Sequence, residues 1–196
     1  MKNIYHILTI AATLSLISCK ESGRVNDSNL NEDRNEAAAE SNTDKFEGKK
    51  QKDADFVFEV LASSYGELKL AELANQRSRT SEVKQIAEKV QTENAASLNE
   101  LKTFAQAKAI SVPVEETDAA KRKIENIAGE SGLEFDKEWC KEMMDLHDQT
   151  IGRFEERLED TQDVELKAFI TKTLPVLKNH HESLKACNEK LKNKNG

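Results

Sequence analysis

Apolar residues recur every three or four positions through most of the chain from residue 53 onward, which is the spacing of one face of an α-helix. No run in this part of the sequence alternates apolar and polar residues as a half-buried strand does. The periodicity predicts four long helices and one short one, over residues 53–76, 81–108, 118–128 and 134–159 and from Asp163 past Leu191. Two short turns and one long connection predict an all-α fold, a four-helix bundle of two antiparallel hairpins joined by a crossover that carries the short helix.

The N-terminus has the pattern of an export signal. Lys2 precedes an uncharged apolar run over residues 7–17. At about 1.5 Å per residue this run covers roughly half of a 30 Å hydrocarbon core, which is typical of a signal peptide and too short for a membrane span. Residues 16–19 (Leu-Ile-Ser-Cys) resemble the bacterial lipobox. The resemblance implies cleavage after Ser18 and lipidation of Cys19, and the alternative is a plain secretory signal with an incidental cysteine.

The residues after Cys19 bear on which membrane the anchor enters. Lys20 follows the cysteine, so the aspartate that marks inner-membrane retention in such lipoproteins is absent. Lys20-Glu21 also loosely resembles a surface-export signal of some bacterial lipoproteins. We therefore expect a lipid-anchored protein of the cell envelope, on the outer membrane, with the periplasmic or surface face left open.

Residues 20–52 predict a disordered tether. They are rich in Asn, Ser, Asp, Glu and Lys, and their large apolar residues are Val25, Leu30 and Phe46. Such a segment cannot bury enough apolar surface to offset the entropy lost on ordering. The expected organisation is a signal peptide over residues 1–18, a lipidated cysteine and tether over 19–52, and a helical domain over 53–196.

Composition and charge exclude several functions. The chain has 29 basic and 36 acidic residues and a formal net charge of −7, which argues against nucleic acid as a partner. The sequence has no Gly-rich phosphate loop and no serine or cysteine in a motif with a base, so it supports neither nucleotide binding nor nucleophilic catalysis and favours a non-enzymatic role. The membrane, through the lipid anchor, is the one partner indicated, and the sequence identifies no protein partner.

Each row of apolar residues on the four long helices contains one interior polar residue. These residues are Glu67, Asn94, His147 and His180. In an antiparallel hairpin, residues at equal distances from the turn lie side by side, and both pairs are nearly equidistant from their turns. We therefore predict that the four residues, called the polar layer below, meet at one level near the middle of the bundle.

The helical part resembles the domain of unknown function family 4142, whose members are exported bacterial proteins with a ferritin-like helical bundle. The resemblance covers residues 53–191 and includes Gly66-Glu67 with Leu70-Ala71-Glu72-Leu73-Ala74, Val83-Lys84 with Ala87, Phe135-Asp136, Phe154-Glu155, Leu166-Lys167, and Thr173-Leu174-Pro175 before His180. Family members typically have an Asp-His pair in the second and third long helices. This chain has Glu93-Asn94 and Leu146-His147 there, so one histidine and one aspartate of the family pattern are missing.

The polar layer allows two principal interpretations. Glu67, His147 and His180 are a ligand set suited to iron or zinc, and Glu93, one position off the inward row, could add a second carboxylate. The same side chains, with Asn94, could instead form a buried hydrogen-bonded cluster that fixes the register of the helices. We favour the structural cluster over the metal site, and a catalytic acid–base site is a third, less favoured, interpretation.

Two further cysteines lie on the inward rows. Cys140 precedes His147 by one heptad and Cys187 follows His180 by one heptad, so the two cysteines should lie level with each other. Paired cysteines commonly bridge in the oxidising compartments that exported proteins enter. We therefore predict a disulfide between Cys140 and Cys187, and the alternative is two buried free thiols.

Overall fold

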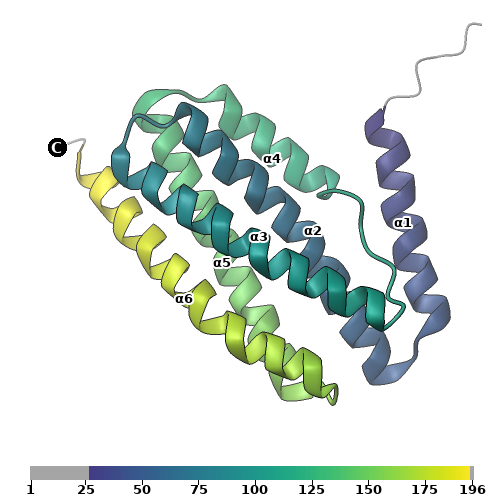
Figure 1. Cartoon of the computed structure of the whole chain (residues 1–196). Coiled ribbons are helices and arrows are strands. Elements are labelled where there is room, and N and C mark those ends of the chain that lie inside the picture. The colour runs from purple at the N-terminus through teal and green to yellow at the C-terminus, as the bar shows by residue number, and fades with distance from the viewer. Residues whose placement is uncertain (1–26, 195–196) are drawn as a thin grey trace, which may run out of the picture.

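The computed structural model describes residues 27–194, and within this range the chain is helical with no β-strand (Figure 1). The helices are α1 (Asp27–Lys45), α2 (Gly48–Arg77), α3 (Ser81–Ala107), α4 (Asp118–Gly129), α5 (Gly132–Asp160) and α6 (Val164–Asn193). None of these helices combines the length and the apolar character that crossing a membrane requires. The predicted signal peptide and Cys19 lie outside the described residues.

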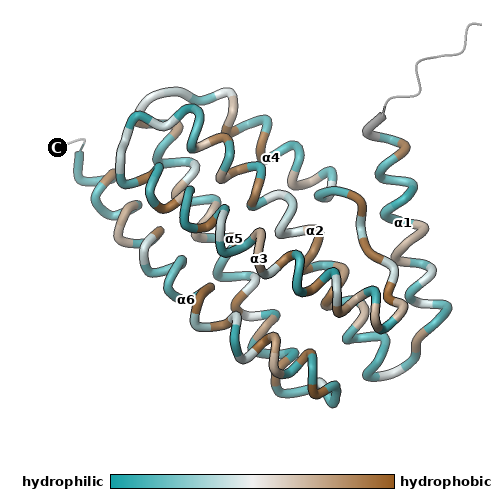
Figure 2. Tube along the Cα trace, viewed as in Figure 1, coloured by the Kyte–Doolittle hydropathy of each residue, from teal (hydrophilic) through white to brown (hydrophobic). Residues whose placement is uncertain are grey.

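The four long helices form a bundle. α2 packs against α3 and α5 against α6 as two hairpins, while α2 also contacts α5 and α3 contacts α6. Apolar positions recur along each long helix (Figure 2). Their side chains form two buried clusters, one toward each end of the bundle, and all four long helices contribute to both. The short α4 lies against α2 and α5 in the long connection between the hairpins. The all-α prediction is confirmed for the described residues, and the predicted helix ends agree with the structure to within a few residues except at the start of α2.

The prediction of a disordered tether is wrong for residues 27–52. This segment contains α1 and the first turn of α2. Two asparagines of α1, one heptad apart, bind the backbone of the extended segment that precedes α4. Asn42 accepts a hydrogen bond from Ser111 N at 2.7 Å and donates one to Ser111 O at 2.8 Å. Asn35 accepts from Val114 N at 2.8 Å and donates to Glu115 O at 3.3 Å. Hydropathy did not indicate this helix because polar side chains hold it in place.

The two hairpins repeat each other at an interval of 83 residues. α3 and α6 begin at Ser81 and Val164, which are separated by this interval. The turn before each helix contains the same hydrogen bond, in which a buried hydroxyl accepts from the backbone N–H two residues later. Ser78 provides this hydroxyl in the first turn, at 3.1 Å, and Thr161 provides it in the second, at 3.2 Å. Equivalent positions in the two halves can therefore be compared directly.

Candidate functional site

The polar layer forms where the sequence predicted it. Glu67 from α2, Asn94 from α3, His147 from α5 and His180 from α6 all lie inside the bundle, and none is more than 6% exposed. Each of the four long helices contributes one of these residues, because each occupies the position on its helix that faces the bundle axis. The structure thus brings together all four residues singled out from the apolar rows.

Glu67 is the centre of the first half of the polar layer. The side-chain amide of Asn94 donates a hydrogen bond to Glu67 Oε2 at 2.7 Å. The hydroxyl of Ser63, one turn earlier on α2, donates to Glu67 Oε1 at 3.3 Å. Ser63 was not predicted to be part of this site. Its position four residues before Glu67 on a helix nevertheless places the two side chains on the same face.

The two histidines form the second half of the polar layer. His147 Nε2 lies 3.3 Å from His180 Nδ1, with the two rings edge to face. His147 Nδ1 lies 2.9 Å from the backbone carbonyl of Met143. Because a carbonyl oxygen can only accept, Nδ1 of His147 carries a proton, and a neutral His147 presents the lone pair of Nε2 to His180. Glu67 Oε2 lies 3.9 Å from that same Nε2 and joins the two halves.

Glu93 closes the layer at the surface. Its side chain is 40% exposed, and its Oε2 lies 2.6 Å from His180 Nε2. Burial lowers the pKa of His180 below its usual value, and the neighbouring His147 lowers it further, whereas the hydrogen bond to Glu93 acts in the opposite direction. The neutral form of His180 then donates Nε2–H to Glu93 and leaves a second lone pair, on Nδ1, facing His147.

The four residues proposed as metal ligands are Glu67, Glu93, His147 and His180. Unlike the residues of the polar layer, they do not meet at one point. Glu93 binds one ring nitrogen of His180, while His147 faces the other, so Glu93 and His147 lie on opposite sides of the ring. As the side chains stand, no group of three or more His, Cys, Asp or Glu residues in the range 27–194 is arranged to hold a metal ion. The remaining histidine, His181, lies at the rim, 3.8 Å from Asp148, and is not part of the layer.

The cysteines of the inward rows also meet. Cys140 and Cys187 are buried free thiols whose sulfur atoms are 3.1 Å apart, with Cys140 donating to Cys187. This hydrogen bond lowers the pKa of Cys187, because it stabilises the Cys187 thiolate. The pKa of Cys140 is raised by the same interaction and by burial. The structure confirms that the two residues lie side by side, and the disulfide itself stays a prediction.

We expect the thiols of Cys140 and Cys187 to disappear when the purified full chain with the Cys19→Ala substitution is treated with oxidised glutathione, whose disulfide takes up their two electrons. The bridge would link residues 47 positions apart, and closing a loop of this length contributes about 3–4 kcal/mol to stability. Thiol titration in denaturant before and after treatment measures the change. If two thiols still react after prolonged oxidation under partly unfolding conditions, the predicted bridge is excluded.

Comparison with known proteins identifies the family. Residues 36–187 match the model of a family described as a domain of unknown function, DUF4142. The matched range begins within α1, so the family pattern includes part of the segment expected to be a tether. No curated protein and no solved structure matches the chain. The match covers more than half of the sequence, and the chain belongs to the DUF4142 family.

Proposed function

We propose that this protein is a lipid-anchored lipoprotein of the bacterial cell envelope whose ferritin-like four-helix bundle acts as a structural or interaction module. The observation that carries the second part is that each side chain of the polar layer lies within hydrogen-bond distance of another polar group, the two facing histidine nitrogens being paired when one of the rings is protonated. Some buried side-chain atoms elsewhere in the described chain have no hydrogen-bond partner, among them one carboxylate oxygen each of Glu116 and Asp136. No such atom belongs to the polar layer.

A layer whose side chains pair with one another fixes the register of the helices that carry them. Sliding one helix by a turn would place Glu67 or His147 against apolar side chains, where a polar group without a partner costs about 1–3 kcal/mol or more. The layer therefore favours one alignment of α2, α3, α5 and α6 over its neighbours. This supports a rigid module rather than a reaction centre.

The membrane attachment rests on the sequence around Cys19. Several acyl chains on one residue give stable anchoring, since each buried methylene contributes about 0.8 kcal/mol and one chain alone is marginal. The absence of aspartate after Cys19 favours the outer membrane. On this proposal the protein is attached to the membrane through the acyl chains on Cys19.

A metal site for iron or zinc is the second candidate, favoured by one specific feature. With His147 and His180 neutral, two nitrogen lone pairs face each other at 3.3 Å, close to the separation of two nitrogen ligands around a tetrahedral zinc ion with bonds of about 2.0–2.1 Å. Glu67 Oε2, 3.9 Å from His147 Nε2, would have to move closer to become the third ligand.

Metal analysis separates the two candidates. We expect the full chain, purified without chelator, to contain no stoichiometric metal, and we expect its thermal midpoint to stay unchanged when iron or zinc is added. Near-stoichiometric metal that is lost in the His147→Ala/His180→Ala double variant would contradict the structural proposal and establish the metal site. His181→Ala is the matched control, because this histidine adjoins His180 in sequence and lies outside the layer.

A further inference from the structure

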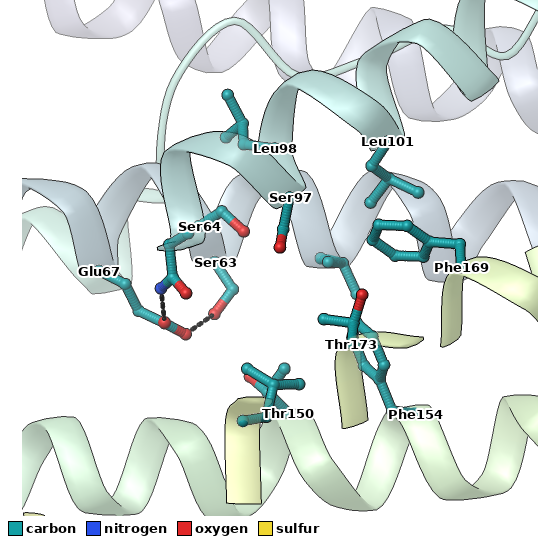
Figure 3. Close-up of a pocket in the computed structure, with 13 residues that line it drawn as sticks. Ser63, Ser64, Glu67, Ser97, Leu98, Leu101, Thr150, Phe154, Phe169 and Thr173 are labelled. Carbon is teal, nitrogen blue, oxygen red and sulfur yellow. Dashed lines mark hydrogen bonds between the residues drawn. The ribbon is translucent and has the colours of Figure 1, made fainter. Parts of the chain in front are cut away.

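A small cavity lined by both polar and apolar side chains lies between the four long helices, next to Glu67. Its volume is about 20 Å³. Side chains from all four long helices line it, including Glu67, Asn94 and the hydroxyls of Ser63, Ser64, Ser97, Thr150 and Thr173. In Figure 3 the hydroxyl of Ser97 points toward the central space, and the Glu67 carboxylate lies at one side of it. Each of the four long helices thus contributes at least one residue with a hydrogen-bonding side chain to the lining.

The internal repeat explains why this cavity exists. Stepping by 83 residues relates Ser64 to His147, Ser97 to His180, Glu67 to Thr150 and Asn94 to Leu177. All four residues related in this way to the polar layer, namely Ser64, Ser97, Thr150 and Leu177, line the cavity. The cavity is therefore the counterpart of the histidine pair in the other half of the repeat. Two serines replace two imidazoles there, and the smaller side chains leave space.

Thr150 supplies an independent sign that this space holds a ligand. The residue is 5% exposed, and its hydroxyl has no hydrogen-bond partner among the described residues. Leaving a buried hydroxyl unpaired is costly, so such groups normally bond to protein or to ordered water. A water molecule needs about 10–15 Å³ of such space and two to four polar partners. The cavity satisfies both conditions for one molecule.

We propose that this cavity is a binding site for a single buried water molecule, which accepts or donates hydrogen bonds with Thr150, the facing serine hydroxyls and the Glu67 carboxylate. The polar layer then spans the full width of the bundle. One half is filled by the imidazoles of His147 and His180 and the other half by the water, with Glu67 between them. This inference does not depend on the function proposed above, because it concerns the side of Glu67 away from the histidines.

The substitution Thr150→Val tests the site, since it keeps the shape of the side chain and removes its hydroxyl. With water present, the substitution takes away one of the water's partners, so we expect the urea midpoint of the full chain to fall. In a dry cavity the same substitution would remove an unpaired polar group, so the midpoint would rise or stay unchanged and the proposal would be overturned. Thr103→Val is the control for loss of a threonine hydroxyl, because Thr103 is exposed and its hydroxyl bonds within its own helix.

Direct detection completes the test. Nuclear Overhauser contacts between water and the Thr150 and Leu177 methyl groups of the full chain are expected, with the sign of a long-lived bound water. Their absence would overturn the proposal. A midpoint that instead rises with sodium or potassium in a one-to-one saturating manner, compared with an equal concentration of a bulky organic cation, would assign the cavity to an ion and also overturn it.

Discussion

Replacing Glu67 with alanine is expected to lower the free energy of unfolding of the full chain by about 1–3 kcal/mol or more, the usual cost of leaving a buried hydrogen-bonding group without its partner. The change would deprive the amide of Asn94 and the hydroxyl of Ser63 of their acceptor. It would also leave a void beside a cavity that already exists. Urea unfolding followed by circular dichroism measures the loss.

Two further variants serve as controls for the Glu67→Ala measurement. Glu72→Ala lies on the same helix, is exposed and should change the stability by only a few tenths of a kcal/mol, the normal range for a surface substitution. Glu67→Gln keeps the volume and one acceptor oxygen and should cost clearly less than Glu67→Ala. If Glu67→Ala proves as mild as Glu72→Ala, the polar layer does not hold the bundle together and the structural proposal fails.

Replacing Cys19 with alanine is expected to move the protein almost completely from the membrane fraction to the soluble fraction. On the proposal of a lipid anchor, Cys19 is the residue that carries the acyl chains. Without them the acidic chain has no basic stripe with which to adsorb to anionic lipid. Cell fractionation with immunoblotting measures the distribution, and metabolic labelling with a fatty acid shows directly whether Cys19 is acylated.

Ser22→Ala is the control for this experiment, since it lies beside the lipobox without belonging to it. It should leave both the labelling and the membrane fraction unchanged. Should the unsubstituted chain carry no fatty-acid label and already be soluble, the N-terminus is a plain secretory signal and the anchoring proposal is wrong.

The parts of the fold that follow from local periodicity could be predicted from the sequence. The four long helices, the level of the polar layer and the meeting of Cys140 with Cys187 all depend on counting residues along helices from short turns. The docking of α1 could not be predicted in this way. Asn35 and Asn42 bind backbone groups 69 to 80 residues away in the chain, and neither is apolar.

The chemistry of the site was harder to predict than its location. The sequence placed Glu93 one position off the inward row, but it could not show that Glu93 meets the outer nitrogen of His180 while His147 meets the inner one. Which ring nitrogen faces which group depends on side-chain rotation, for which helical spacing gives no information. The cavity depends on how the two hairpins pack together in three dimensions, which helical spacing does not give.

The polar docking of α1 has a mechanical consequence. In a chain anchored at Cys19, any pull between the membrane and the bundle passes through α1 before it reaches α2. The grip on the segment before α4 consists largely of the amide hydrogen bonds of Asn35 and Asn42, which water can replace one at a time. The apolar core, in contrast, would unfold only cooperatively, with all four long helices separating at once. Under load α1 should therefore detach first. The connection between Cys19 and α2 would then lengthen while the bundle stays intact.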